Sequence, residues 1–120
     1  MESEVPELQR RIHYIVSGDN TTNVQPNSAD VALIIDTYHH FEYPAEMMHS
    51  IHETLKPRAR LYLVDFHRIV GVSSEWVLGH VRAGSDVFRS EVESAGFRFV
   101  RDWSSEAELS TNYCFEFSKA

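Results

Sequence analysis

Acidic and imidazole side chains occur together in one short segment of this chain. Asp36 is followed directly by Thr37 and Tyr38, and then by the pair His39 and His40. Imidazole gains or loses a proton near neutral pH, so a histidine can act as a general base when a substrate lies within reach. If the fold presents this segment at an open edge, it could bind a polar ligand or transfer a proton.

Another acidic residue and another histidine follow expected strands. Several of these acidic and histidine residues could equally have a purely structural role. Asp19 lies in the sequence Gly-Asp-Asn, and His67 comes just after an apolar run. Asp19 is typical of a turn, while Asp36 can cap the backbone after its strand. The pair His39 and His40 can be polar residues at the start of a helix. Residue types alone leave both explanations open.

The segments around these residues alternate between strand and helix patterns. Ile12–Val16 has the β-branched and aromatic content of a strand, and the polar segment Ser17–Ser28 is typical of a loop. Ala29–Asp36 is apolar almost throughout, as expected for a strand buried on both faces of a parallel sheet. Pro44 suits the first turn of a helix, and Pro57 is predicted to end that helix.

The later part of the chain predicts one more apolar strand, two helices and a hairpin. The strand is Arg60–Phe66, and the helices begin at Ser74 and Ser85. Phe97–Asp102 and Asn112–Phe117 alternate between apolar and polar residues, which predicts two paired strands. Carboxyl ends of parallel strands are where open α/β sheets bind ligands, and the polar residues above stand at such ends.

Composition narrows the class of protein. The chain has 120 residues, a net charge of −7 and a pI near 5.4, which argue against a nucleic-acid-binding surface. Cys114 is the only cysteine, so a multi-cysteine zinc site and an internal disulfide are excluded. Residues 2–11 are polar and predict a short helix rather than a signal peptide. No apolar run is long enough for a membrane span, so we expect a cytoplasmic protein.

The ordered set of segments resembles the later half of class I S-adenosylmethionine (SAM) methyltransferases. The strand–helix–strand unit from Ala29 to Asp65 carries most of this resemblance. The phrase Glu93-Ser94-Ala95-Gly96-Phe97 is similar to the junction before the family's final hairpin, and Ile12–Asp19 is similar to its third strand and Gly-Asp turn. The fold that this implies is α/β, a partial Rossmann-like methyltransferase sheet that is mostly parallel with an antiparallel C-terminal hairpin.

The resemblance also implies roles for the residues at the strand ends. The implied cofactor-binding residues are Asp19, Asp36, Thr37 and Tyr38, of which the first would face the adenine of SAM. The implied catalytic residues, at the border of the substrate pocket, are His39 and His40. Since the sulfonium of SAM is already activated, catalysis in such a site is mainly positioning and desolvation, sometimes with a general base.

The chain departs from the family in the part that holds the cofactor. Only 28 residues precede Ala29, and Gly18 is the only glycine among them, so the family's glycine-rich turn is absent. The acidic residue that normally binds the ribose is absent too. The glycine pair expected after Lys-Pro is replaced by Arg58 and Ala59. We therefore expect weak or absent binding of SAM by the isolated chain.

Three functions follow as hypotheses. The first is a single truncated domain over residues 1–120, inactive alone and self-associating as a homodimer. The second is one half of a split SAM methyltransferase that a partner chain completes. The third is a small metal-site or hydrolytic enzyme using Asp36, His39, His40 and His67. Under the first hypothesis, the apolar edge of Val31–Ile35 is covered by a second copy of the chain. The alternative is that Ile12–Val16 pairs beside this strand within the same chain.

Overall fold

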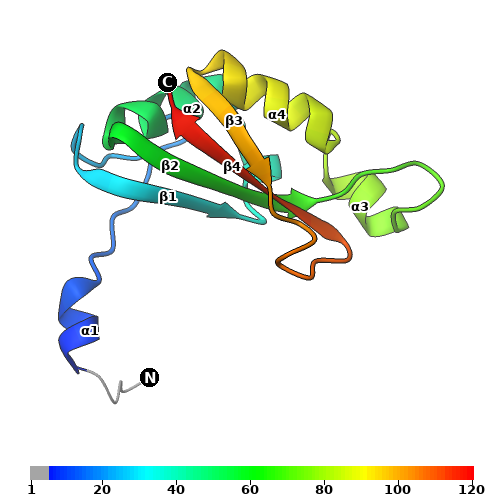
Figure 1. Cartoon of the computed structure of the whole chain (residues 1–120), viewed down its shortest axis with the longest axis horizontal. Coiled ribbons are helices and arrows are strands. Elements are labelled where there is room, and N and C mark those ends of the chain that lie inside the picture. The colour runs from blue at the N-terminus through cyan, green and yellow to red at the C-terminus, as the bar shows by residue number, and fades with distance from the viewer. Residues whose placement is uncertain (1–5) are drawn as a thin grey trace.

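The computed structural model describes residues 6–120, which form one mixed sheet of four strands in the order β1-β2-β4-β3. The strands β1 (Ala29–Ile35) and β2 (Leu55–Phe66) are parallel. The hairpin of β3 (Phe97–Asp102) and β4 (Asn112–Lys119) is antiparallel and joins the sheet through β2 (Figure 1). The predicted partial Rossmann-like sheet with an antiparallel C-terminal hairpin is confirmed, although β1 and β2 form the only parallel strand pair within residues 6–120.

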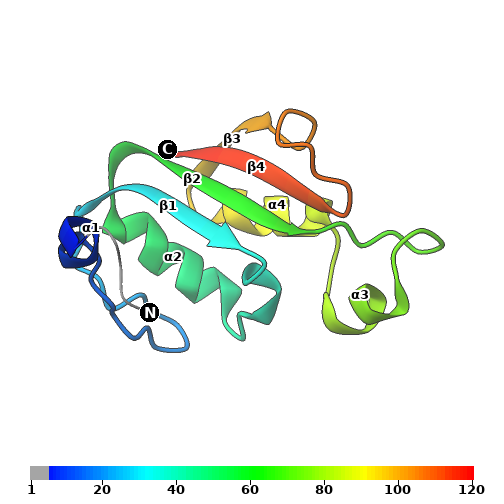
Figure 2. The ribbon, with the colours of Figure 1, turned by 90° about the horizontal axis from the view of Figure 1, so that it is seen from below.

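Helices cover one face of this sheet. Figure 2 shows α2 (Pro44–Thr54) and α4 (Ser85–Ser94) beneath the strands, with α3 (Glu75–His80) beyond the end of β2. A short 3-10 helix, η1 (Tyr38–His40), follows β1. The helix α1 (Pro6–Arg11) stands away from the sheet (Figure 1). Within residues 6–120, no helix is long and apolar enough to cross a membrane.

The hydrophobic core lies between the sheet and these helices. Alternate residues of β2 and β4 point into it, as the period of two in a strand requires. Fully buried core side chains include Met48, Leu61, Leu63, Phe88 and Phe117. The apolar residues after Pro44 recur with helical spacing because they form the face of α2 that packs on the sheet.

Two predicted segment boundaries are wrong. Ile12–Val16 is not a strand: it has no regular secondary structure and Tyr14 is 92% exposed, because no strand among residues 6–120 pairs with its backbone. The helix α2 ends at Thr54 rather than at Pro57, and Pro57 lies inside β2. It is tolerated there because the register with β1 shifts at this point, and prolines in strands occur at such irregularities. Of the helix expected over residues 2–11, only α1 falls within the described residues.

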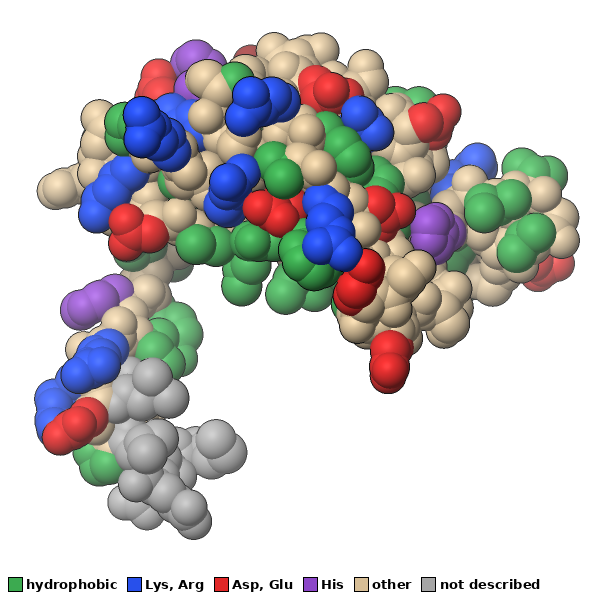
Figure 3. All heavy atoms as spheres, in the orientation of Figure 1, with side chains coloured by type: hydrophobic (Ala, Val, Ile, Leu, Met, Phe, Trp, Pro, Cys, Tyr) green, Lys and Arg blue, Asp and Glu red, His purple; other side chains and the backbone are tan. Residues whose placement is uncertain are grey.

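The strand β1 is an edge strand with one open face, which corrects the expectation of burial on both faces. Ala32 and Ile34 face the helices, but Val31, Leu33 and Ile35 are 51%, 65% and 56% exposed. Figure 3 shows hydrophobic side chains gathered along β1 on the uncovered side of the sheet. The edge that β1 turns away from β2 has no strand partner among residues 6–120, so it remains available for pairing.

Candidate functional site

The carboxyl ends of β1 and β2 meet at one edge of the sheet and carry the acidic residues noted in the sequence. The backbone N–H of Asp36 donates to the carbonyl of Val64 over 2.8 Å, which extends the β1–β2 ladder by one bond. Its Oδ1 accepts a hydrogen bond of 2.6 Å from the Asn112 amide at the start of β4. Asp36 has φ +53°, a left-handed conformation that aspartate tolerates better than most residues. This turn directs the chain into η1.

A buried histidine–aspartate pair holds η1 against the end of β2. His39 Nδ1 lies 2.8 Å from Asp65 Oδ1, and the His39 backbone N–H donates to Asp65 Oδ2 over 3.2 Å. The backbone N–H of Phe66 also donates to Asp65 Oδ1, over 2.7 Å. The two side chains are 1% and 0% exposed. One carboxylate therefore fixes both the ring of His39 and the turn that carries it.

The other ring nitrogen of His39 is unengaged. Nε2 is buried and has no hydrogen-bond partner among residues 6–120. The ring lies 4.1 Å from the His40 ring and 5.9 Å from that of Phe66, measured between centroids. A histidine oriented by a carboxylate at one nitrogen is arranged as a general base at the other. Because Nε2 is covered, a substrate would reach it only after His40 or Phe66 moved.

Tyr38 belongs to a different, inward-facing network. Its side chain is fully buried, and its hydroxyl donates to Glu91 Oε1 over 2.8 Å. Both nitrogens of the Arg82 guanidinium contact the same carboxylate, over 2.8 and 2.5 Å. The Tyr38 ring packs edge-on against Phe88, with 4.8 Å between centroids. The network joins η1 to α4, so the Tyr38 side chain packs in the interior rather than lining the surface.

Burial and charge set the protonation of this network. Burial, and then the hydrogen bond to Glu91, raise the pKa of the Tyr38 hydroxyl well above its ordinary value. The hydrogen bond from Arg82 lowers the pKa of Glu91. Burial also raises the pKa of Tyr113, with a further contribution from the charge of Asp65. Both tyrosines are therefore neutral at physiological pH, while Glu91 is ionised; the Tyr38 hydroxyl donates to Glu91, and the buried Tyr113 hydroxyl has no hydrogen-bond partner among residues 6–120.

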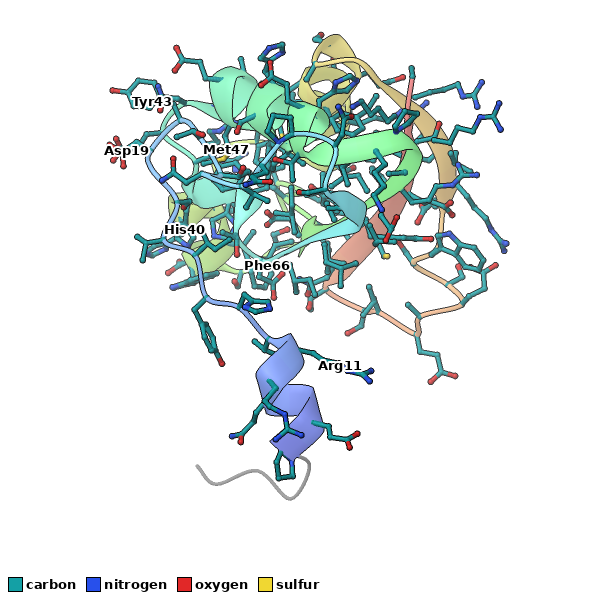
Figure 4. All side chains as sticks on the ribbon, turned by 90° about the vertical axis from the view of Figure 1, so that its left-hand side faces the viewer. Arg11, Asp19, His40, Tyr43, Met47 and Phe66 are labelled. Carbon is teal, nitrogen blue, oxygen red and sulfur yellow. The ribbon has the colours of Figure 1, made fainter. Side chains whose placement is uncertain are left out.

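His40 and Asp19 line one small hollow on the surface. His40 is exposed, and the hollow of about 180 Å³ that it lines also includes Gly18, Asp19 and Met47. Figure 4 shows Asp19, His40 and Met47 on the same side of the molecule. The structure thus brings together two predicted site residues from opposite sides of β1 in the sequence. The hollow is smaller than the roughly 300–1,000 Å³ typical of pockets for small organic ligands.

A larger groove of about 400 Å³ runs along the open edge of β1. It lies between this strand, the chain around Thr22 and the helix α2, and Thr37 lines one end of it. Three threonine hydroxyls in it are already hydrogen-bonded. Thr22 Oγ1 lies 3.0 Å from Thr54 Oγ1, and Thr37 Oγ1 donates to the carbonyl of Ile35 over 2.8 Å. The residues present do not fit a whole SAM molecule, whose ribose and amino-acid groups need free polar partners.

His67 lies apart from the other predicted residues. It lines a cavity of about 410 Å³ between the loop after β2 and the loop before β4, together with Ile69, Val72 and Thr111. Its ring is 5.4 Å from that of Tyr113. The cavity is mainly apolar in its lining. Within residues 6–120, no three His, Cys, Asp or Glu side chains come together as a metal site.

The sequence did not reveal the hydrogen-bond partners that hold the predicted site residues in place. Asp65 was recognisable as an acid at the end of a strand, and the parallel pairing of β1 and β2 brings it beside η1. Asn112, Arg82 and Glu91 gave no local signal, because each meets its partner only through packing of distant elements.

A model of the methyltransferase domain family matches residues 2–63, which is just over half of the chain. The chain belongs to the methyltransferase domain family. This match covers β1, η1, α2 and most of β2, the elements that carry the strand-end residues above. A search of curated proteins found no match.

Solved structures of SAM-dependent methyltransferases share the fold. One from Aquifex aeolicus has a TM-score of 0.61 at 23% identity, over 96% of this chain and 58% of its own. One from Thermotoga maritima has a TM-score of 0.68 at 16% identity, over 97% of this chain and 69% of its own. A methyltransferase of Haloferax volcanii, solved with the Trm112 methyltransferase activator, has a TM-score of 0.70 at 10% identity, over 96% and 66%.

The methyltransferase-like domain described here is therefore a partial one. It spans 58% of the Aquifex aeolicus chain, less than two thirds of that methyltransferase's length. The predicted resemblance to a partial SAM-dependent methyltransferase domain is confirmed by the family match and by this coverage.

Proposed function

We propose that this chain is a methyltransferase-like domain that does not transfer methyl groups on its own and that self-associates through β1. The observation that carries the proposal is the exposure of β1 at the edge of the sheet. This strand leads into the site residues Asp36 and His39, yet it is an edge strand with exposed Val31, Leu33 and Ile35. An apolar strand with an open edge is a ready surface for pairing with another chain.

Lack of activity follows from the cofactor contacts that the chain can offer. Asp19 and Asp36 are exposed carboxylates in the predicted cofactor region, but Asp36 is tied to Asn112. Thr37 is bonded to its own backbone, and the Tyr38 hydroxyl points inward to Glu91. SAM would be held by few polar groups, although relatives in the family are SAM-dependent. When bound, SAM supplies the activated methyl group, and this chain supplies part of its binding surface.

Within a completed site, His39 and His40 remain the proposed catalytic residues. Asp65 orients His39, and His40 covers it at the surface. A substrate that displaced His40 would meet Nε2 of His39 as a proton acceptor. The lone cysteine is consistent with our placement of the protein in the cytoplasm, where thiols stay reduced.

Calorimetric titration with S-adenosylhomocysteine tests the proposal, with the solution mass measured on the same sample. We expect a dissociation constant above about 1 mM for the protein alone, corresponding to less than roughly 4 kcal/mol of binding free energy. The reason is the small number of free polar groups along β1. Micromolar affinity would show that the chain builds a complete cofactor site, and would overturn the proposal of inactivity.

A second candidate is one half of a split methyltransferase that a partner chain completes. The observation in its favour is that this chain spans 58% of the Aquifex aeolicus enzyme, and that the Haloferax volcanii relative was solved with an activator protein. Coexpression with a neighbouring reading frame that encodes a glycine-rich strand–turn–helix would test it. A stable complex that binds S-adenosylhomocysteine at micromolar concentration would favour this candidate over self-association. The metal-site alternative has no supporting cluster of three His, Cys, Asp or Glu side chains in the part of the chain that the structure describes.

A further inference from the structure

A basic pocket lies at the end of the sheet opposite to the strand-end site. It has a volume of about 240 Å³ and is formed where β2 begins and β4 ends. Its lining residues are Arg58, Arg60, Arg98, Ser118 and Lys119. Figure 1 shows this end of the sheet beside the C-terminus, and Figure 3 shows Lys and Arg side chains gathered over it. The pocket is thus separate from Asp36 and His39.

Positive charge in this pocket is largely uncompensated, although the whole chain carries a net charge of −7. Among the described residues, the carboxylate of Glu116 forms an ion pair with a pocket residue: it lies 3.5 Å from Arg60 Nε and accepts a hydrogen bond of 2.7 Å from the Trp103 indole. Arg58 and Arg98 are exposed and form no ion pair within residues 6–120. Two guanidinium groups are therefore free to bind an anion.

Ser118 provides a second, independent indication of a ligand. This residue is 5% exposed, and its Oγ is buried with no hydrogen-bond partner among residues 6–120. In the sheet it stands between Arg60 on β2 and Arg98 on β3, its two cross-strand neighbours. A buried hydroxyl without a partner is costly, and each such group in a protein needs an explanation. An oxyanion between the two arginines would accept its hydrogen bond.

The backbone of Arg58, which lines the pocket, has an unusual conformation. Its φ is +67°, in the left-handed region that favours glycine, and β2 makes its irregular start here. An arginine is therefore held in a disfavoured conformation at the mouth of the pocket, and its guanidinium makes no ion pair within residues 6–120 that would offset the strain. Strained residues of this kind occur at ligand sites.

We propose that this pocket binds a phosphate group, either as free phosphate or as a small phosphate monoester. The planar guanidinium of arginine matches phosphate oxygens in pairs, and Ser118 adds a single donor. Lys119 Nζ donates to the carbonyl of Leu55 over 2.6 Å, so this residue contributes mainly its charge. A volume of about 240 Å³ suits one phosphate group with a short substituent. A nucleic-acid backbone is disfavoured, because the net charge of −7 opposes a long polyanion. The site does not depend on methyltransferase activity.

Titration of the full chain with inorganic phosphate, and in a second arm with glycerol 3-phosphate, tests the proposal. Ionic strength is held constant with chloride, and binding is followed by calorimetry and by the shift in Tm. We expect saturable binding and a rise in Tm that chloride alone does not give. Tighter binding of glycerol 3-phosphate would identify a monoester as the ligand, and equal binding would identify free phosphate.

Single substitutions distinguish binding at the pocket from a general effect of charge on phosphate binding. Arg58→Gly removes a cation and relieves the strained backbone, so it should weaken phosphate binding about tenfold without lowering the Tm measured in chloride. Ser118→Ala should weaken binding by a smaller factor. Arg89→Gln is the matched control, because Arg89 lies on α4 and pairs with Glu93. Absence of saturable binding, or equal weakening by Arg58→Gly and Arg89→Gln, would overturn the proposal.

Discussion

Asp65 accepts hydrogen bonds from the His39 ring, from the His39 backbone and from the Phe66 backbone, so it joins η1 to the end of β2. Such a carboxylate can orient a catalytic base and stabilise the fold at the same time. Because Asp65 is completely buried, removing the His39 ring would leave its carboxylate with only the backbone donors of residue 39 and Phe66, which is costly for a buried charge. The structural role can therefore be measured even if the proposed base function needs a partner chain.

Replacing His39 with Ala should lower the free energy of unfolding by about 3 kcal/mol, the range expected when one member of a buried pair is removed. Urea denaturation followed by circular dichroism measures this change. His40→Ala is the control, since His40 is exposed and its loss should change stability by less than about 0.5 kcal/mol. Equal stability of wild type and His39→Ala would show that the pair does not stabilise η1.

The two buried tyrosines predict a loss of stability at high pH. Burial raises the folded-state pKa of Tyr38 and of Tyr113, so the stabilisation is fully present below the unfolded-state pKa of about 10. Above that pH, the unfolded chain loses protons that the folded chain keeps. Each tyrosine should then lower the free energy of unfolding by up to about 1.4 kcal/mol per pH unit.

Urea unfolding at pH 8, 10 and 11 checks this dependence. Tyr38→Phe should make the decline above pH 10 shallower, because one of the two groups no longer titrates. At pH 8 the same variant should cost about 1 kcal/mol for the lost hydrogen bond to Glu91. Tyr14→Phe, at a site that is 92% exposed, should leave the slope unchanged. An identical slope in all three proteins would contradict the assignment.

At the scale of elements, the junction between α4 and β3 depends on one glycine. Gly96 has φ +102°, and its backbone N–H donates to the carbonyl of Glu93 over 3.1 Å to close the helix. A Cβ on residue 96 would lie 3.0 Å from His52 Nε2 on α2. This position therefore needs glycine for its backbone conformation and for the close approach of α2.

Substitution of Gly96 by Ala should lower the free energy of unfolding by about 2 kcal/mol, through left-handed strain and the contact with His52. Thermal or urea unfolding gives the value. Gly79→Ala is a matched control, because Gly79 lies inside α3, where a Cβ would meet no neighbouring side chain within 4 Å, and alanine favours helix there. If both variants were equally stable, the junction would have to tolerate a side chain by moving α2.

At the scale of the whole molecule, the sheet has a covered face and an open one. The open face is apolar along β1 and becomes polar toward β3, where Arg98 and Arg101 lie. Arg101 stacks on the Trp103 ring, with 3.7 Å from the guanidinium carbon to the ring centroid, and this shields part of the face. Only the β1 side is left, among residues 6–120, as a continuous apolar strip with a free strand edge, which is why we propose association there.

Light scattering across a dilution series should give the mass of two chains at high concentration. Ile35→Lys should shift the protein to the mass of one chain while circular dichroism shows the fold intact, because Ile35 is 56% exposed and a lysine there blocks apolar pairing. Ile34 is unsuitable for this test, since it is buried in the core.

Val70→Lys is the control for this experiment. Val70 is 79% exposed on the loop after β2, outside the sheet, so the variant should keep the mass of the wild type. A mass of one chain for the wild type at all concentrations would reject the homodimer. Because Ile12–Val16 does not pair with β1, such a monomer would carry an uncovered strand edge in solution.

From Ala29 onward, local sequence patterns predicted the order of strands and helices and the position of the candidate residues along them. The apolar runs of β1 and β2 and the proline at the start of α2 are local signals, which depend only on neighbours along the chain. They place Asp36 and the two histidines just beyond a strand. The family's glycine-rich turn could also be seen to be absent from the residues before β1.

Tertiary structure alone decided what these residues contact. His39 meets Asp65 across 26 positions of sequence, and Tyr38 meets Glu91 across 53, through strand register and helix packing that local patterns do not specify. It also decided that Ile12–Val16 remains unpaired and that one face of β1 is open. A strand pattern predicts extended chain, but whether that chain joins a sheet depends on a partner strand that lies elsewhere in space.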